Sequence, residues 1–397
     1  MVPNPKISVT SESFRHLSEG IGEAGDVLRH EGLKRIIETG LFWAGSQEMG
    51  RLLLRVSAEG FSYVTDPRLA TSIGGIALEG PTGIAAGWDK TGKSILGWQA
   101  LGANHITVGG VPLYPQAGNR MPRLRTFDKT VGDHGKSVSL NSFGFYSPGS
   151  KKVAYNIGKQ KETGEVSIPV IVQVTVNKEF YEPANKQAIP NVLVEAVRQV
   201  KPVADGIEVG INSPNTAGMR GYDSEFEEFL YANYMAAHEA AGDLPFSFKA
   251  DADGGEQGLD MYSRLGLRTG ADFISLINTT AKKEIKGKYG AEDLPGGLAG
   301  ADPEYQQMAI DAVRYVFEAI GDKVDIMGMG GNNSDQQQIG LITAGARATG
   351  VNSAVRQHGH RAVSQRDIDA SNFMRRMNLR SLDRLAGLAT KRGPLAA

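Results

Sequence analysis

The chain contains no cysteine among its 397 residues. It therefore forms no disulfide bond, binds no metal through thiolates and uses no cysteine as a nucleophile or acid–base group. An excess of charge of one sign is also lacking, because 43 lysine and arginine residues nearly balance 44 aspartate and glutamate residues. This balance argues against a nucleic-acid partner and against binding to acidic lipids through net charge.

Long apolar runs are missing as well. No run approaches the ~20 residues that a helix needs to span a bilayer, and the amino terminus lacks the apolar core of a signal peptide. Histidine, aspartate and glutamate do not cluster at metal-ligand spacing, so we expect no metal site. These absences predict a cytoplasmic protein.

Glycine is abundant instead, with 50 residues against a usual share of ~7%. Many glycines directly follow short apolar runs, where the backbone turns tightly or approaches a ligand. Eight such runs stand at 83–87, 104–109, 169–174, 206–211, 245–250, 272–277, 324–329 and 347–352. Most are apolar on both faces, as parallel strands covered by helices should be.

Helical patterns separate many of these runs, at 192–200, 225–241, 256–265, 303–320 and 336–344. Alternating strands and helices of this number predict an α/β fold of the (β/α)8 or TIM-barrel type, whose usual length is ~250 residues. An open doubly wound sheet is the alternative. Such a sheet more often carries a G-x-G-x-x-G turn after its first strand, and this chain has none there.

The sequence divides into three predicted parts. Residues 1–71 have apolar residues at helical spacing and form a helical cap, residues 72–385 form the barrel, and residues 386–397 form a loose tail. Bulky apolar residues gather at 41–43 and 49–53, so the cap either packs on the barrel or admits lipid-like molecules at a membrane surface. The proline- and glycine-rich segment 109–150 is expected to be a lid or binding loop.

Polar side chains follow the fourth apolar run in the segment 210–218, which reads GINSPNTAG. Pro214 fixes its own φ and pushes Ser213 towards extended geometry, which stiffens the turn. Hydroxyl and carboxamide groups provide donors and acceptors without net charge, which suits a polar, uncharged heterocycle. A helix-capping turn would use the same residue types, so the other strand ends must decide between the two interpretations.

In a (β/α)8 barrel the active site lies at the C-terminal ends of the strands. The glycine- and hydroxyl-rich turns after the last two predicted strands are typical of phosphate sites, because bare backbone N–H groups point at the ligand. The candidate residues at these ends and in the long loop are Ala85, Ala86, Gly87, Lys90, Gly109, Gly110, Asn141, Phe145, Gln173, Ser213, Asn215, Thr216, Lys249, Asn278, Thr279, Gly330, Gly331, Asn352 and Ser353.

Five ordered segments resemble the class 2 dihydroorotate dehydrogenases, which are membrane-associated and quinone-dependent. They are 83–90 (GIAAGWDK), 115–119 (PQAGN), 213–218 (SPNTAG), 278–280 (NTT) and 328–331 (GMGG). The resemblance covers nearly the whole chain. It implies an FMN-dependent barrel with a helical cap that oxidises dihydroorotate to orotate in pyrimidine biosynthesis, passes electrons to a quinone and contacts the inner membrane peripherally.

The resemblance also implies roles for individual residues. Ser213 would be the base that removes a proton while hydride passes to FMN, and Lys249 would stabilise negative charge near the flavin. Lys90 would pair with the substrate carboxylate. The implied substrate-binding residues are Lys90, Asn141, Phe145, Asn215, Thr216, Asn278 and Thr279. The implied FMN-binding residues are Ala85, Ala86, Gly87, Gly109, Gly110, Asn141, Gln173, Lys249, Asn278, Gly300, Gly330, Gly331, Asn352 and Ser353.

Some positions depart from the family pattern. Gly210 stands where the family has an asparagine shortly before its serine-rich run, and Gln173 stands where the family has an asparagine that touches the flavin. The lid segment 141–146 (NSFGFY) also differs, and the loop 127–139 is longer and more polar. These changes affect the substrate ring and the quinone more than the flavin.

The departures leave alternatives open. One is an FMN-dependent oxidoreductase that acts on another cyclic amide or on an unsaturated acid. Another is a lyase barrel in which Lys249 forms a Schiff base, and a third is a flavin-binding protein without catalytic activity. Fumarate, a nicotinamide or oxygen are alternatives to quinone as the electron acceptor.

Overall fold

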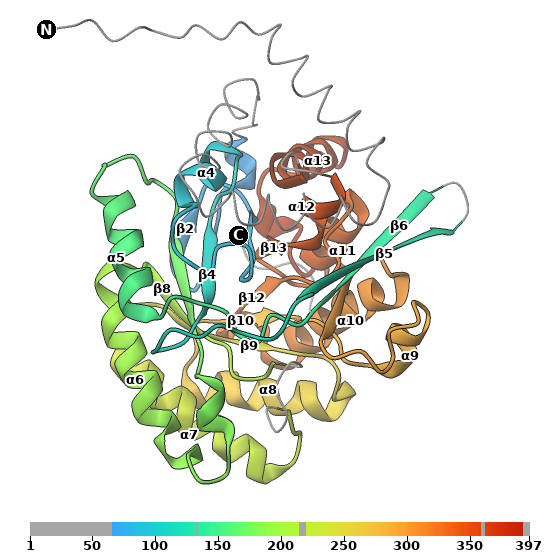
Figure 1. Cartoon of the computed structure of the whole chain (residues 1–397). Coiled ribbons are helices and arrows are strands. Elements are labelled where there is room, and N and C mark those ends of the chain that lie inside the picture. Colours follow the sequence, from blue (N-terminus) through green and yellow to red (C-terminus); the bar gives the residue numbers. More distant parts are fainter. Residues whose placement is uncertain (1–65, 132–133, 214–219, 359–361, 392–397) are drawn as a thin grey trace, which may run out of the picture.

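The computed structural model describes residues 66–131, 134–213, 220–358 and 362–391, and within these ranges a closed barrel of eight parallel strands is surrounded by helices (Figure 1). Sheet pairing closes the barrel because the last strand pairs with the first, with Thr349 opposite Thr82. The barrel strands are β3 (Thr82–Ile84), β4 (Ile106–Val111), β7 (Val170–Val174), β8 (Gly206–Val209), β9 (Phe246–Ala250), β10 (Phe273–Leu276), β12 (Asp325–Gly328) and β13 (Ala348–Val351). All eight predicted strands are present, so the (β/α)8 prediction is confirmed and the open sheet is excluded.

Helices cover the outside of the barrel (Figure 1). They are α4 (Ile95–Ala100), α5 (Ser150–Lys161), α6 (Ile189–Val200), α7 (Ser224–Ala241), α8 (Gly255–Thr269), α9 (Lys283–Gly287), α10 (Pro303–Ile320), α11 (Asp335–Thr343), α12 (Ser353–His358) and α13 (Ala362–Arg376). Short polar side chains set several starts: Asp223, Asp302 and Ser334 each accept a backbone N–H in the first turn of α7, α10 and α11. The five predicted helices are confirmed, with ends that shift by a few residues.

A small hairpin closes the barrel at the N-terminal ends of the strands. It consists of β1 (Thr71–Ile73) and β2 (Ile76–Leu78), and its turn donates the Gly74 N–H to Asp325 Oδ2 at 2.8 Å. Ile73, Ile76 and Leu78 are buried in one cluster with interior barrel residues such as Phe273 and Met327. The hairpin therefore closes the barrel at the N-terminal ends of the strands, and the C-terminal ends remain as the open side.

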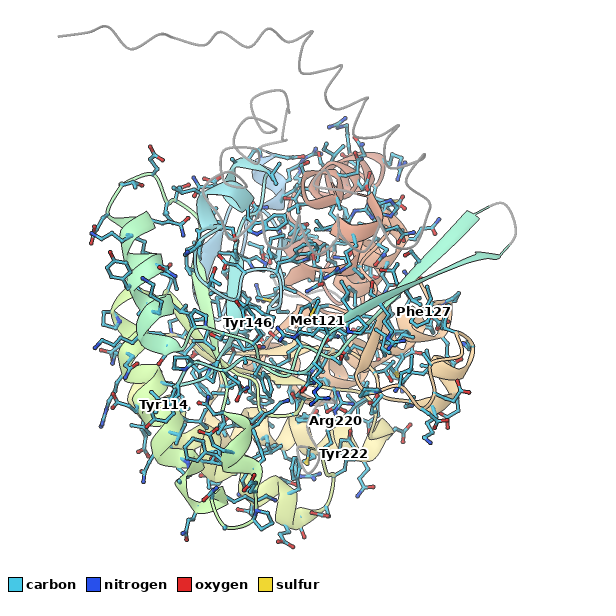
Figure 2. All side chains as sticks on the ribbon, in the orientation of Figure 1. Tyr114, Met121, Phe127, Tyr146, Arg220 and Tyr222 are labelled. Carbon is cyan, nitrogen blue, oxygen red and sulfur yellow. The ribbon has the colours of Figure 1, made fainter. Side chains whose placement is uncertain are left out.

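The long segment after β4 contains a second hairpin that the sequence analysis did not predict. Strand β6 (His134–Asn141) pairs with β5 (Leu124–Val131) on one side and with β11 (Gly297–Gly300) on the other, and the hairpin of β5 and β6 projects away from the barrel in Figure 1. Phe127 packs beside Tyr289, with ring centroids 6.3 Å apart (Figure 2). The strand β6 ends at Asn141, so the hairpin delivers this residue and the turn after it to the mouth of the barrel.

The C-terminal boundary differs from the prediction. Ala386 is 1% exposed, and the backbone N–H groups of Gly387 and Ala389 donate to carbonyl oxygens of Ile342 and Thr343. Packing against α11 thus continues beyond residue 385, so the prediction that a loose tail begins at 386 is wrong. Residues 392–397 and residues 1–65 of the predicted cap lie outside the described residues.

Candidate active site

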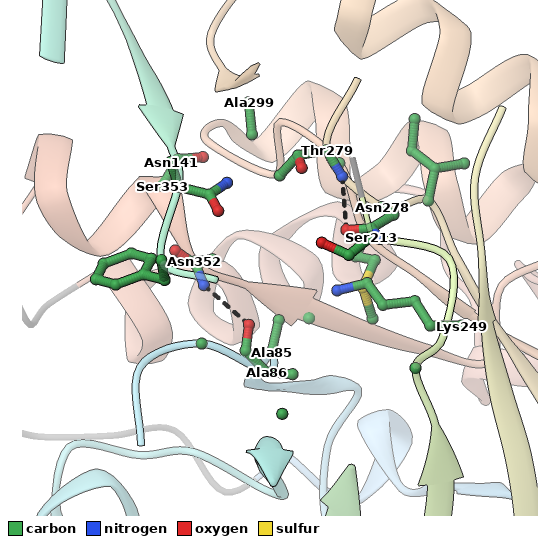
Figure 3. Close-up of a pocket in the computed structure, with 18 of the residues that line it drawn as sticks. Ala85, Ala86, Asn141, Ser213, Lys249, Asn278, Thr279, Ala299, Asn352 and Ser353 are labelled. Carbon is green, nitrogen blue, oxygen red and sulfur yellow. Dashed lines mark hydrogen bonds between the residues drawn. The ribbon is translucent and has the colours of Figure 1, made fainter. Parts of the chain in front are cut away.

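A cavity opens at the C-terminal ends of the barrel strands (Figure 3). The charged side chains in its lining are Lys90, Lys249 and Arg356, and the described lining contains no aspartate or glutamate. Figure 3 shows Ser213, Asn278 and Lys249 grouped on one side and Asn141, Asn352 and Ser353 on the other. A concave site with convergent polar groups and only positive charge suits a small anionic ligand.

Most residues predicted from the strand ends meet in this cavity. Those that line it are Ala85, Ala86, Gly87, Lys90, Gly109, Gly110, Asn141, Phe145, Gln173, Ser213, Lys249, Asn278, Thr279, Gly330, Gly331, Asn352 and Ser353. Gly300 is not brought to the lining. It lies behind Gly331, where a Cβ on Gly331 would come 2.6 Å from the Gly300 carbonyl oxygen, and its neighbour Ala299 lines the cavity instead. Asn215 and Thr216 lie outside the described residues.

The turn after β12 exposes bare backbone. Gly330 and Gly331 have φ values of +113° and +60°, which side chains other than glycine rarely adopt. Ser353, at the start of α12, lines the same cavity, and its hydroxyl donates to Asn333 Oδ1 at 2.9 Å. Arg356, whose guanidinium carbon is 4.8 Å from the Trp88 ring centroid, adds a positive charge that the sequence analysis missed.

Two lysines bring positive charge into the cavity. Lys90 is 8% exposed, and burial together with repulsion from Lys249 lowers its pKa to about 8. Burial also lowers the pKa of Lys249, while the carboxylate of Glu208 counteracts that shift. Within the described residues, no carboxylate oxygen lies within ion-pair distance of either ammonium group. Buried charges of this kind call for an anionic partner, which a ligand can supply.

Ser213 follows the end of β8 after three intervening residues and is 8% exposed, with its side chain in the cavity lining. The neighbouring carboxamides are held by local hydrogen bonds. Asn278 Oδ1 accepts the Thr279 N–H at 2.9 Å, and Asn141 Nδ2 donates to the Gly297 carbonyl at 3.1 Å. Their positions are therefore fixed by the strand ends before a ligand arrives.

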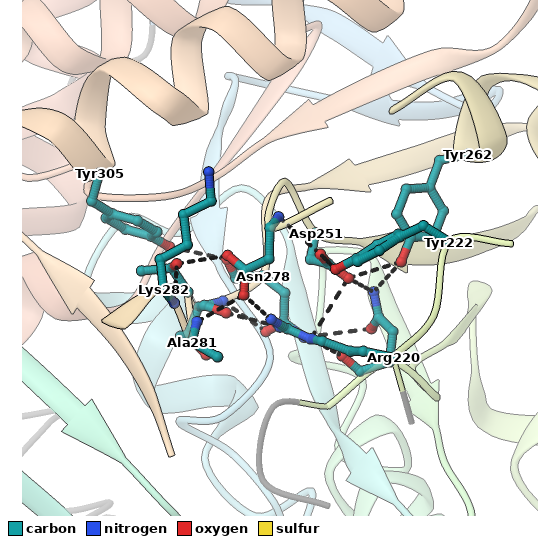
Figure 4. Close-up of polar contacts among 12 residues, drawn as sticks. Arg220, Tyr222, Asp251, Tyr262, Asn278, Ala281, Lys282 and Tyr305 are labelled. Atoms are coloured by element: carbon teal, nitrogen blue, oxygen red, sulfur yellow. Dashed lines mark hydrogen bonds and ion pairs between the residues drawn. The ribbon is translucent and has the colours of Figure 1, made fainter. Parts of the chain in front are cut away.

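An arginine that the sequence analysis missed connects the strand ends on this side (Figure 4). Arg220 Nε donates to the Asn212 carbonyl at 3.1 Å, and its Nη2 donates to the Thr279 carbonyl at 2.9 Å. Its Nη1 pairs with the carboxylate of Asp253. Arg220 thus joins the backbone beside Ser213 to the backbone beside Asn278, although the two segments are far apart in the sequence.

A second buried carboxylate completes this network. Asp251 accepts hydrogen bonds from Tyr222 at 2.6 Å, from Tyr262 at 2.8 Å and from Asn212 Nδ2 at 3.2 Å (Figure 4). Both aspartates follow Lys249 within four residues at the end of β9. The position of the two aspartates just after a strand end was visible in the sequence, but the sequence did not show that Arg220, Tyr222 and Tyr262 contact them.

We expect Arg220→Lys to destabilise the protein by ~1–3 kcal/mol, because one ammonium group cannot replace three directed contacts to two carbonyls and a carboxylate. Urea unfolding would measure the change. Arg268→Lys is the matched control. Arg268 pairs with Glu227 and Glu228, but its side chain is 37% exposed and lysine keeps the charge, so the replacement should change little. Equal effects of the two substitutions would contradict the role given to Arg220.

The described residues contain neither a cluster of metal ligands nor a membrane-spanning helix. No group of three or more histidine, cysteine, aspartate or glutamate side chains there could hold a metal ion. Among the described helices, none combines the length and apolar character that crossing a bilayer requires.

A closed (β/α)8 barrel with a cationic, polar cavity at its strand ends is the architecture of a barrel enzyme for an anionic small molecule. The sequence profile of the family described as dihydroorotate dehydrogenase matches residues 68–369. Relatives named dihydroorotate dehydrogenase (quinone), from Mycobacterium sp. (strain KMS) and Mycobacterium tuberculosis (strain ATCC 25618 / H37Rv), are each 30% identical to this chain over 295 and 284 residues. The alignments cover 74% and 71% of this chain, and 78% and 74% of those relatives. The chain belongs to the dihydroorotate dehydrogenase family, which confirms the resemblance and makes it an oxidoreductase.

Solved structures support the fold. The ligand-free crystal structure of DHODH from Eimeria tenella matches with a TM-score of 0.73 at 22% identity, covering 86% of this chain and 98% of that chain. The ferulenol complex of the same Eimeria tenella protein matches with a TM-score of 0.72, also at 22% identity, covering 86% and 95%. Both comparisons agree with the observed closed barrel.

Proposed function

We propose that this protein is an FMN-dependent enzyme that oxidises dihydroorotate to orotate and passes the electrons to a quinone. The observation that carries the proposal is the meeting of Ser213 with Lys90 and Lys249 in one cavity whose described lining lacks carboxylates. Dihydroorotate has one carboxylate and uncharged ring amides, so its chemistry complements lysines and carboxamides at the same site. Family membership favours this redox reaction over a Schiff base at Lys249 or binding without catalysis.

The cavity residues fit FMN. Gly330, Gly331 and Ser353 would hold its phosphate through backbone N–H and hydroxyl groups, with Arg356 as a positive partner. Lys249 would stabilise negative charge on the ring system, and the bare backbone of Gly109 and Gly110 would allow that ring to approach closely. When bound, FMN supplies the two-electron acceptor of the reaction.

The remaining residues would bind and deprotonate the substrate. Lys90 would pair with its carboxylate, while Asn141, Asn278 and Thr279 would bind the ring amides from opposite sides of the cavity. Ser213 would take the proton. A serine hydroxyl is a weak base, so it also needs a partner that passes the proton onwards.

The affinity for orotate is expected to fall as pH rises through about 8, because only the charged form of Lys90 pairs with a carboxylate and burial lowers its pKa to about 8. Above that value, the Kd should rise by up to about ten-fold per pH unit. Titration of the FMN-loaded protein with orotate, followed by the flavin spectrum, would measure this. An affinity that stays flat through this pH range would argue against Lys90 as the carboxylate partner.

A quinone acceptor is supported by the names of the mycobacterial relatives and by the apolar residues at 41–43 and 49–53. A soluble ubiquinone analogue, fumarate, a nicotinamide and oxygen can be compared as oxidants of the reduced, full-length protein. We expect the quinone to react fastest. Faster reoxidation by any of the other three would show that the acceptor is wrong while leaving the dihydroorotate reaction in place.

A further inference from the structure

A buried carboxylate lies in the barrel directly below the cavity. Glu208 is 1% exposed and stands opposite Gln173 in the register between β8 and β7. Its Oε1 accepts a hydrogen bond from Gln173 Nε2 at 2.5 Å, and its Oε2 accepts one from the Ser275 hydroxyl. Gln173 lines the cavity, whereas Glu208 and Ser275 do not.

This arrangement determines which end of the Gln173 carboxamide faces the ligand. A carboxylate only accepts hydrogen bonds, so the amide NH₂ group must point at Glu208. The amide oxygen then turns the other way, and it would lie 3.2 Å from a Cβ placed on Gly110, which lines the cavity. Gln173 therefore presents an acceptor, and its counterpart on a ligand is an N–H donor.

Gly210 makes room for this side chain. A Cβ at position 210 would lie 2.9 Å from Gln173 Cδ and 3.1 Å from its Nε2. Such separations are shorter than the contacts that packed atoms tolerate, so any larger residue at 210 would displace the glutamine. The two departures from the family pattern thus form one matched pair, with Gln173 on β7 and Gly210 directly after the neighbouring strand β8.

Lys249 lies near the same carboxylate. Lys249 stands opposite Ser275 in the register of β9 and β10, and the negative charge of Glu208 acts to raise the pKa of Lys249. Glu208 therefore faces two hydrogen-bond donors and one positive charge, each of which complements an acceptor oxygen.

We propose that Glu208 is a positioning residue, which fixes Gln173 as an acceptor for an imide N–H of the bound ligand. This inference rests on the proposed function. The flavin ring and dihydroorotate both carry an imide N–H, so either of them can be the partner of Gln173. Gly210 has no side chain, which leaves the space that the Gln173 side chain occupies.

The test uses Glu208→Gln in the full-length protein. The new amide can donate to Gln173, which allows Gln173 to turn its NH₂ group towards the ligand, so the affinity for the imide partner should fall by about ten-fold or more. Ser275→Ala is the matched control, because it removes the other contact of Glu208 and leaves the bond to Gln173. Circular dichroism and the thermal midpoint verify that each variant is folded.

Binding is measured in separate arms: FMN and 3-methyl-FMN to the apoprotein by quenching of flavin fluorescence, and orotate to the FMN-loaded protein. A loss for FMN, with weaker discrimination against 3-methyl-FMN, identifies the flavin imide as the partner. A loss confined to orotate identifies the substrate. Folded Glu208→Gln protein that binds both ligands like wild type overturns the proposal, and wild type that binds neither overturns the proposed function as well.

A double-mutant cycle tests independently whether Gly210 makes room for Gln173. Gly210→Ala should weaken binding of the same ligand in the wild-type background and have little effect in a Gln173→Ala background, where the three atoms nearest to the added methyl group are gone. Equal effects in both backgrounds would show that Gly210 and Gln173 are not coupled.

Discussion

Ser213→Ala is expected to leave FMN bound and to slow the reduction of the flavin by dihydroorotate by ~10²–10⁴-fold. Ser213 lines the cavity beside Asn212. The described lining contains no carboxylate that could replace Ser213 as the base. A methyl group at this position cannot accept or relay a proton. Stopped-flow absorbance under anaerobic conditions measures the rate of the reductive half-reaction alone.

Ser247→Ala provides the control for this substitution. Ser247 is a buried serine of strand β9 whose hydroxyl donates to the Ile207 carbonyl at 3.1 Å, and it does not line the cavity. Its replacement should leave the rate nearly unchanged. A Ser213→Ala protein that reduces its flavin as fast as the control would remove Ser213 from the mechanism.

Lys90→Met is expected to weaken orotate binding by ~2–5 kcal/mol, the usual consequence of removing one partner of a buried charge pair. The substitution keeps an unbranched apolar chain in contact with the Phe143 ring, whose centroid is 5.2 Å from Lys90 Nζ, so packing is largely preserved. FMN should remain bound. The pH dependence of orotate affinity near pH 8 should also disappear in this variant.

Lys93→Met is the matched control for Lys90→Met, because Lys93 lies in the same segment and does not line the cavity. Isothermal titration with orotate would compare both variants with wild type. Equal losses in the two variants would point to a general change of charge, and an unchanged affinity in Lys90→Met would place the carboxylate elsewhere.

The barrel could be predicted because its strands are apolar on both faces and its longer helices have periodic apolar stripes. Strands β1 and β2 were missed because three residues are too few to establish an alternating pattern. The hairpin of β5 and β6 was missed for another reason. It pairs outside the barrel, so its strands do not show the continuous apolar character that marked the others.

The candidate site was predictable where topology alone brings residues together. Every strand end of a parallel barrel points to the same side, so Lys90, Ser213 and Lys249 could be assigned to one cavity before their distances were known. Arg220 was not predictable in this way, because its contacts with the segments after β8, β9 and β10 depend on how far its side chain reaches. Likewise, Gly210 and Gln173 were noted as separate departures, since a sequence contains no measure of the 2.9 Å contact that couples them.

The central claim is tested most directly by mixing the purified, FMN-loaded protein with dihydroorotate in the absence of oxygen and recording the flavin absorbance. The account predicts that the flavin bleaches within the mixing experiment, that one orotate forms per flavin reduced, and that a ubiquinone analogue then restores the yellow colour. A flavin that remains oxidised in excess dihydroorotate, in protein that binds FMN and is reduced by dithionite, would contradict the account.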